Sequence, residues 1–403
     1  MTQPHIMLFD LYAGGHHGQY VRQLVEHWGT HRFRGRLTVT APAAFFDRHG
    51  DVVDAAHAVQ GVELVHISET VDTQGHLSSA LAHGRLLKRY VETIKPSHAV
   101  CMYFDQVQLA LALGLRFSYP VQLSGIYFRP TFHYEPSGPH KLRDRVVQLR
   151  KRLLLHSALR NPHFRALFCL DPFVVPHVDK GLAQVVALPD GAPVHPPLHD
   201  AESQRAQWGV AQGRRIALFF GSIAARKGIY QTLEALPLLS AAHQKQLSLV
   251  IAGRALTHDA VRVRDRIAQC RADTQVQIIH DERFADEEDL AGFFHAANLV
   301  LLPYQRHVGS SGVLIRAAQA GVPVLGPNYG LVGRYVQTHQ LGITVDSVRP
   351  SAVAAGLSQW LRGSSMPFNK ASALAFGRRN TAKQFCKTIM GALLPDIPPP
   401  THV

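Results

Sequence analysis

A loop rich in glycine and serine in the second half of the chain has the composition of an anion-binding site. The stretch HVGSSGVLIRAAQAGVPVLGP (307–327) contains Gly309, Ser310, Ser311 and Gly312, followed by small residues and an apolar run. Glycine lets the backbone approach a ligand closely, and serine caps helices and donates from its hydroxyl group. Because helix N-termini attract anions and this stretch has no acidic residue, we expect it to hold a phosphate-bearing ligand.

Two cationic side chains follow a strand-like run in the same half of the chain. Arg226 and Lys227 come after FFGSIAA, in which Gly221 and Ser222 open the loop. Guanidinium and ammonium groups at the carboxyl end of a parallel strand are well placed to contact phosphate oxygens. The simpler alternatives are a solvated charge at Lys227 and helix caps without a ligand at the serines.

Histidines follow the first apolar run of the chain. AGGHHGQY places Gly14 and Gly15 at the mouth of the predicted strand, directly before His16 and His17. A histidine can accept or donate a proton near neutral pH, so either one is a candidate base. The alternative is a solvated or capping role, which is the default in a chain with 25 histidines.

Alternating strands and helices must position these residues. Apolar runs such as HIMLFDLY, GRLTVTAP, HAVCMYFD, RRIALFF, LSLVIAG and NLVLLPY predict buried parallel strands joined through helices, an α/β doubly wound architecture. The proline-rich segment 189–204 predicts a linker between two Rossmann-like lobes that face a central cleft. We expect domains at 1–190 and 191–375, a terminal helix at 376–395 that packs back on the first domain, and a disordered tail at 396–403.

Length and composition agree with two globular domains. The chain has 403 residues, of which 46% are hydrophobic and 18% are charged. The N-terminus has no leader pattern, and no run of about 18 apolar residues is present, so we expect a cytoplasmic protein. The four cysteines are scattered, without metal-ligand spacing, and we expect reduced packing residues and no built-in metal.

The charge of the chain calls for an anionic partner. The formal net charge is +13, and the clearest basic cluster is 141–165, where apolar residues recur near helical spacing. One interpretation is a helix on acidic lipid headgroups, with the protein peripheral at the inner face of the membrane. The other is a basic solvated helix that covers its own core. No nucleic-acid partner is expected, because aromatic residues are not interleaved with the basic ones.

The order of these segments resembles the GT-B fold, in particular the retaining enzymes of glycosyltransferase family 4. The carriers are LPDGAPV, FFGSIAARKGI, LVIAGRA, NLVLLPY and GSSGVLIRAAQAGVPVLG, within 186–346. The resemblance implies a hexosyl-type transferase that moves a sugar from a nucleotide-diphosphate donor to a hydroxyl acceptor, without a built-in cofactor. The acceptor that we expect is a carbohydrate or a lipid-linked sugar.

The residue types and positions, together with the resemblance, give three sets of candidate site residues. The catalytic candidates are His16, His17, Asp105, Arg226 and Lys227. The donor-binding candidates are Gly14, Gly15, Gly221, Ser222, Arg226, Lys227, Gly253, Arg254, Arg283, Phe284, Tyr304, His307, Gly309, Ser310, Ser311, Gly312 and Arg316. The acceptor-binding candidates are Tyr127, Arg129 and His133. Core packing at Tyr127, a helix cap at Asp105 and a surface charge at Arg254 are the alternatives.

The paired glutamates that are usual in the family are absent. Its second glutamate aligns with Arg316 and its first with Val308. One hypothesis is that Arg316 binds phosphate or changes the choice of donor. The other is a non-catalytic relative that binds a nucleotide or a carbohydrate, and a sugar-nucleotide epimerase is a further alternative. We favour an active transferase, because the phosphate-facing features are retained and such catalysis rests on positioning and electrostatics.

Overall fold

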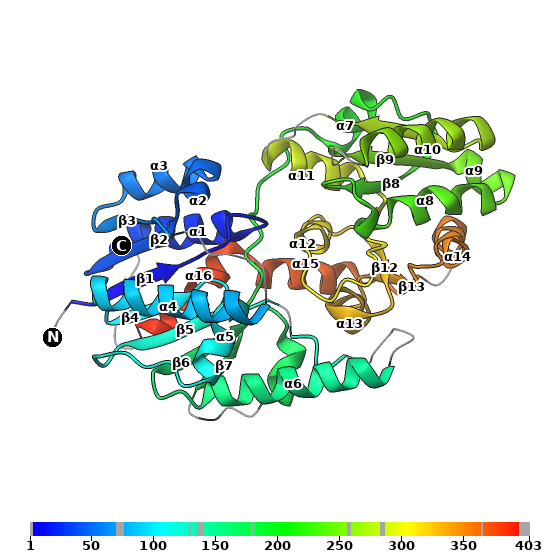
Figure 1. Ribbon diagram of the computed structural model, residues 1–403. Helices are drawn as coiled ribbons and strands as arrows, with labels where there is room; N and C mark the ends of the chain where they lie inside the picture. The colour runs from blue at the N-terminus through cyan, green and yellow to red at the C-terminus, as the bar shows by residue number, and fades with distance from the viewer. Residues whose placement is uncertain are drawn as a thin grey trace. The chain divides into compact units, whose positions relative to one another are not determined.

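The computed structural model describes residues 3–69, 76–128, 130–134, 141–178, 181, 183–255, 259–282, 287–363 and 366–394. The chain forms two compact units (Figure 1). Unit 1 comprises Met1–Gly191 and Ala382–Val403, and unit 2 comprises Ala192–Thr381. Every helix in the part of the chain that the structure describes is too short or too polar to span a lipid bilayer.

Unit 1 is built on a seven-stranded parallel sheet with the order β3-β2-β1-β4-β5-β6-β7. Its strands are β1 (His5–Phe9), β2 (Arg36–Pro42), β3 (Val62–Ile67), β4 (His98–Cys101), β5 (Gln122–Tyr127), β6 (Phe164–Cys169) and β7 (Gln184–Ala187). The helical elements are α1 (His17–Thr30), α2 (Ala43–Arg48), α3 (Gly50–Ala58), α4 (His76–Ile94), α5 (Phe104–Ala112), α6 (Lys141–Leu159), the 3₁₀ turn η1 (Pro172–His177) and α16 (Ala382–Leu393).

Both faces of this sheet are covered, which explains the apolar run at 6–9 in the interior strand β1. In β1, Ile6 and Leu8 point into a core shared with α1, α2, α3 and α16. Met7 and Phe9 point into a second core shared with α4, α5 and α6. All four side chains are buried, as expected when successive residues of a strand face opposite layers.

Unit 2 repeats the architecture with a six-stranded parallel sheet of order β10-β9-β8-β11-β12-β13. Its strands are β8 (Arg215–Phe220), β9 (Leu247–Ala252), β10 (Gln277–Asp281), β11 (Leu299–Leu301), β12 (Val324–Pro327) and β13 (Gly342–Val345). Its helical elements are α7 (Ala201–Gln207), η2 (Ala225–Lys227), α8 (Ile229–Ala235), η3 (Leu236–Leu238), α9 (Ala241–Gln246), α10 (Ala260–Asp273), α11 (Glu287–Ala296), α12 (Gly312–Gln319), α13 (Gly330–Thr338), α14 (Pro350–Arg362) and α15 (Lys370–Arg379). The predicted fold class, two doubly wound α/β units, is confirmed.

The last helix of the chain belongs to unit 1. The ring of Phe385 in α16 stacks on Tyr20 of α1 at 4.7 Å, and Phe385 is fully buried. The preceding helix, α15, packs on α12 in unit 2. The chain therefore re-enters unit 1 at residue 382 and not at 376, and it leaves at 191. The predicted tail at 396–403 lies outside the described residues.

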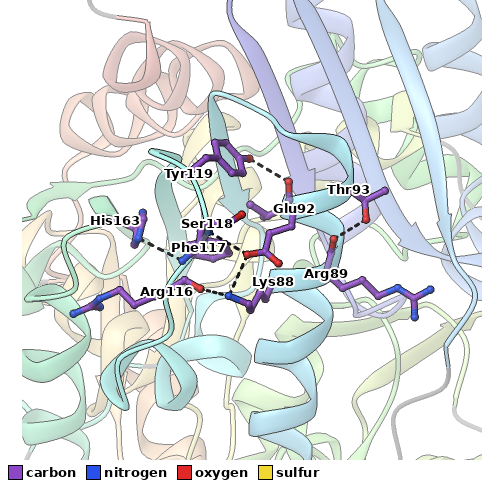
Figure 2. Close-up of polar contacts among 10 residues, drawn as sticks. Lys88, Arg89, Glu92, Thr93, Arg116, Phe117, Ser118, Tyr119 and His163 are labelled. Carbon is purple, nitrogen blue, oxygen red and sulfur yellow. Dashed lines mark hydrogen bonds and ion pairs between the residues drawn. The ribbon is translucent and has the colours of Figure 1, made fainter.

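A polar network fixes the amino end of β5, as Figure 2 shows. Lys88 of α4 donates from Nζ to the carbonyl oxygen of Arg116 at 2.6 Å and pairs with Glu92 at 3.1 Å. The Glu92 carboxylate accepts from the backbone N–H of Ser118 at 3.1 Å. These bonds tie α4 to the turn before β5. They fix the sheet at the amino ends of its strands. The loops at the opposite, carboxyl edge are the ones that carry ligand sites in sheets of this kind.

Candidate functional site

Backbone hydrogen bonds join the ends of three strands of unit 2, and glycines occupy the positions that donate them. The N–H of Gly221 donates to the carbonyl of Ala252 at 2.9 Å, and the N–H of Gly253 donates to that of Asp281 at 2.8 Å. Gly221 and Gly253 have φ of +102° and +136°. A Cβ atom on Gly253 would lie 2.2 Å from the carbonyl oxygen of Gly221. The ends of β8, β9 and β10 therefore form one close-packed edge that larger residues would disrupt.

Lys227 reaches back over this edge. Its Nζ lies 5.7 Å from the centroid of the Tyr304 ring, and a Cβ atom on Gly221 would lie 2.6 Å from the same Nζ. Burial, helped by the neighbouring Arg226, lowers the pKa of Lys227 to about 8. The ammonium group is thus held in a partly desolvated position, where an anionic ligand would stabilise its charge.

Tyr304 connects Lys227 to the start of α12. Its hydroxyl lies 3.0 Å from Oγ of Ser311, and burial raises the pKa of this phenol to about 12. Ser311 is the N-cap of α12 and accepts from the backbone N–H of Leu314 at 3.4 Å. The first residue of the helix is Gly312, around which a Cβ atom would meet nothing within 4 Å. The N-terminus of α12 and the lysine thus share one tyrosine as a neighbour.

The loop before α12 is closed by His307. Its Nε2 lies 3.1 Å from the carbonyl oxygen of Ser310, and its ring packs edge-on against Tyr304 at 5.4 Å. Gly309 leaves room for this ring, because a Cβ atom there would lie 3.3 Å from His307. The predicted GSSG segment therefore lies between the contact of His307 with Ser310 and the capped start of α12.

Two residues that sequence reasoning missed brace this site. The backbone N–H of Gln305 donates to the carbonyl of Arg226 at 2.8 Å, which ties the lysine loop to the end of β11. The hydroxyl of Tyr329 donates to the carbonyl of Tyr304 at 2.6 Å. No local pattern marks either contact, since each joins segments that are distant in the sequence.

The remaining donor candidates of unit 2 are exposed, half-buried or outside the described residues. Ser222, Arg226 and Arg254 are exposed, and Arg254 donates from Nε to the carbonyl of Glu282 at 3.4 Å. Arg316 is half-buried on α12, about one turn from the helix start. Arg283 and Phe284 lie outside the described residues. The site can hold an anion through helix N–H groups, Lys227 and exposed guanidinium groups.

In unit 1, the mouth of β1 carries a buried histidine and an aspartate that sequence reasoning missed. Nδ1 of His17 lies 2.7 Å from Oδ2 of Asp10, and both side chains are almost fully buried. The other oxygen of Asp10 accepts from the backbone N–H of Tyr12 at 2.9 Å. Gly15 turns the loop with a φ of +63°, while His16 is exposed and caps nothing with its side chain.

Aromatic rings surround this histidine. Phe128 stacks on His17 with ring centroids 4.9 Å apart, and Tyr12 and Tyr103 meet it edge-on at 5.1 and 5.2 Å. A Cβ atom on Gly14 would lie 2.7 Å from the Tyr12 ring, so the glycine leaves space for that ring. The sequence showed these aromatics only as separate residues at the ends of three strands.

Two of the three acceptor-side candidates have buried side chains. Tyr127 is only 2% exposed and packs edge-on against Phe104 in the core. His133 is fully buried, with Nε2 3.0 Å from Asp171. Both side chains are packed in the interior of unit 1. Arg129 lies outside the described residues.

Asp105 also differs from its predicted place. β4 ends at Cys101, so Asp105 lies in the first turn of α5 and not at the end of the strand. Its Oδ2 accepts from the backbone N–H of Phe128 at 3.0 Å. It therefore positions the loop that carries the ring stacked on His17.

The architecture of both units is that of GT-B glycosyltransferases of known structure. A glycosyltransferase from Rickettsia africae ESF-5 has a TM-score of 0.63 and 11% identity over 98% of this chain and 100% of that chain. Anabaena Alr3699/HepE in complex with UDP has a TM-score of 0.65 and 16% identity over 97% and 100%. A putative UDP-N-acetylglucosamine 2-epimerase from Listeria monocytogenes shares the fold as well, with a TM-score of 0.57 and 13% identity over 100% of both chains.

At the level of sequence, residues 200–375 match the family described as glycosyl transferases group 1. The match covers most of unit 2, including the lysine loop and the start of α12. No curated protein matches the chain. The family match and the shared fold together support a GT-B glycosyltransferase.

Proposed function

We propose that this protein transfers a sugar from a nucleotide-diphosphate donor to a hydroxyl group of an acceptor. The observation that carries the proposal is the position of Lys227 over Gly221, beside the Tyr304–Ser311 pair at the start of α12. This arrangement lies within the segment that matches the glycosyl transferases group 1 family. Anabaena Alr3699/HepE has also been crystallised with UDP-glucose, which supports a sugar nucleotide as the ligand.

The diphosphate is the part of the donor that these residues suit. Backbone N–H groups at the start of α12 and the ammonium of Lys227 offer hydrogen bonds and positive charge to its oxygens. When the bond to the sugar breaks, negative charge grows on the leaving diphosphate, and the same groups stabilise it. We propose a hexosyl transfer with retention, as in glycosyltransferase family 4, without a built-in metal or cofactor.

The residues at the two glutamate positions bear on the choice of donor. The side chain of Val308 offers no hydrogen bond, and Arg316 carries a positive charge in the last turn of the eight-residue helix α12. We propose that Arg316 contributes an oxyanion contact to the donor in place of a carboxylate contact to the ribose. The absence of the two glutamates then affects the affinity and the choice of donor more than the type of reaction.

The acceptor side of the proposal rests on unit 1. There, His17 is oriented by Asp10 and enclosed by aromatic rings at the mouth of β1. A histidine held by a carboxylate in one orientation is suited to receive a proton from a hydroxyl group. We propose that the acceptor hydroxyl approaches this mouth, and that His16, Gly14 and Gly15 shape the loop around it.

We propose a carbohydrate or a lipid-linked sugar as acceptor and a cytoplasmic protein that associates with the inner face of the membrane. The formal net charge of +13 and the basic segment 141–165 support attraction to an anionic surface. A non-catalytic nucleotide- or carbohydrate-binding protein is the second candidate, and the absent glutamates favour it. An epimerase is less well supported, because such enzymes rely on carboxylates and the unit 2 site offers cations.

The test is isothermal titration of the purified protein with UDP, GDP and ADP. We expect micromolar binding of one nucleotide, a loss of at least about tenfold in Lys227→Ala, and no change in Lys245→Ala, an exposed lysine of α9. Arg316→Glu should weaken binding if the arginine contacts the anion and strengthen it if a carboxylate restores a ribose contact. Absence of binding for all three nucleotides would contradict the proposal, and binding without turnover of any donor would favour the non-catalytic candidate.

A further inference from the structure

Helix α6 presents an apolar stripe to solvent. Val146, Leu149 and Leu153 are 62%, 58% and 59% exposed, and their spacing places them on one line along the helix. The opposite side of the helix carries Leu155 and Leu159, which are buried in the core of unit 1. The exposed residues are therefore not the ones that hold α6 to the sheet. The hypothesis of a basic helix that covers its own core does not account for this stripe.

Arginine rows border the stripe on both sides. Arg143 and Arg150 follow one edge, and Arg145 and Arg152 follow the other, because residues seven apart lie in line after two turns. All four arginines are exposed. A surface with an apolar centre and cationic margins matches a bilayer, which offers hydrocarbon beneath anionic headgroups.

A cavity of about 340 Å³ opens beside the stripe. Phe132, Leu153 and Val178 supply apolar walls, while Arg152 and His177 supply polar groups to the same cavity. The volume falls in the range of about 300–1,000 Å³ that is usual for ligand sites. Leu149 and Leu153 line the cavity and also belong to the stripe, so the two features form one continuous surface.

The helix is fixed firmly enough to present this surface. Lys151 donates from Nζ to Oγ1 of Thr131 at 2.8 Å, and Gln148 donates from Nε2 to the carbonyl of Tyr134 at 2.8 Å. Both bonds join the buried side of α6 to the segment that contains Phe132. The position of α6 along unit 1 can be followed in Figure 1.

We infer that the α6 stripe and its adjoining cavity dock onto an anionic phospholipid bilayer, with an acyl chain in the cavity and the arginines at the phosphates. The inference rests on the membrane association in the proposed function, but on no step of sugar transfer. A second copy of the chain is a poorer occupant, because a two-fold interface would set arginine rows against arginine rows. A nucleic acid would use the arginines and leave the leucines without a partner.

The first experiment measures sedimentation with vesicles at low salt. Wild-type protein should bind vesicles of phosphatidylcholine mixed with phosphatidylglycerol, and bind vesicles of phosphatidylcholine alone weakly. The double variant Leu149→Gln/Leu153→Gln should bind at least about tenfold less, because it keeps every charge and removes the apolar stripe. Arg143→Gln/Arg150→Gln should lose about fivefold per arginine. Leu113→Gln, an equally exposed leucine of unit 1 outside this surface, is the matched control and should bind as the wild type.

The second experiment asks whether the stripe reaches the acyl chains. Leu153→Trp places an indole on the stripe, and vesicles with brominated acyl chains should quench its fluorescence. The natural tryptophans, Trp28, Trp208 and Trp360, are all buried, so the wild type should show little quenching. Val178→Trp should reduce vesicle binding by filling the cavity. Thermal unfolding of each variant shows that it is folded.

Three outcomes overturn the inference. These are no binding of the wild type to anionic vesicles, equal binding by the double leucine variant, and a Leu153→Trp signal that brominated lipid does not quench. A dimer in solution that the leucine variant abolishes would instead assign the surface to a second copy. Titration with nucleotides separates this inference from the proposed function: if a nucleotide binds and vesicles do not, only the lipid surface is wrong, and the reverse result contradicts only the donor site.

Discussion

The carboxylate of Asp10 holds His17 at a distance of 2.7 Å between Oδ2 and Nδ1, and it also accepts the backbone N–H of Tyr12 at 2.9 Å. One buried side chain thus orients the histidine and shapes the loop between β1 and α1. The pair lies at the carboxyl end of the strand, where doubly wound sheets bind their ligands.

Removal of this carboxylate should destabilise unit 1. Asp10→Ala leaves the buried His17 and the N–H of Tyr12 without their acceptor, and we expect a loss of about 2–3 kcal/mol in the free energy of unfolding. The measurement is urea denaturation followed by circular dichroism. His16→Ala, at the exposed neighbour, should change stability by less than about 0.5 kcal/mol. Equal stability of the two variants would show that the pair contributes nothing to the fold.

Nucleotide binding should weaken as the pH rises through 8. The pKa of Lys227 is lowered to about 8, so its ammonium is charged below that pH and neutral above it. Because a diphosphate favours the charged form, affinity should fall by up to about tenfold per pH unit above 8, and binding at pH 8 should take up a fraction of a proton. Titration calorimetry in buffers of different ionisation enthalpy measures both. A flat pH profile that matches that of Lys227→Ala would show that the lysine does not contact the nucleotide.

Loss of the α12 cap should affect stability and binding together. Ser311→Ala removes the cap and the partner of Tyr304, and we expect a loss of about 1–2 kcal/mol in unfolding free energy with weaker nucleotide binding. Ser240 caps α9 in the same way, far from the site in sequence, so Ser240→Ala should lose about 1 kcal/mol and keep its affinity. The helix start has no part in nucleotide binding if both variants bind equally well.

A side chain at Gly253 should disrupt the carboxyl edge of unit 2. Gly253→Ala adds an atom 2.2 Å from the carbonyl of Gly221, and we expect a loss of about 3 kcal/mol or more. Gly213 has a φ of +78°, but a Cβ atom there meets nothing within 4 Å. Gly213→Ala should therefore cost only about 1–2 kcal/mol, the strain of its backbone conformation. Urea denaturation that ranks the two variants equally would contradict the close approach of the strand ends.

The elements of the fold and their repetition follow from patterns within short stretches of the sequence. Runs such as HIMLF and LSLVIA are apolar at every position but one, and every residue of both strands is buried, as expected for strands that are covered on both faces. The glycines after β8 and β9 and the serine before α12 could also be identified from the sequence. Their conformations and caps depend on the local backbone, which a few neighbouring residues specify.

Contacts between side chains that are distant in the sequence are apparent only in the folded chain. Asp10 interrupts an apolar run in the sequence, and nothing local indicates that it pairs with His17. Tyr127 and His133 have polar groups that suit a site, yet packing places both in the interior. The leucines of α6 have the spacing of a buried face, but the helix meets its sheet through Leu155 and Leu159 instead. Periodicity shows that a helix has an apolar face, whereas the orientation of that helix is set by the sum of its contacts with distant parts of the chain.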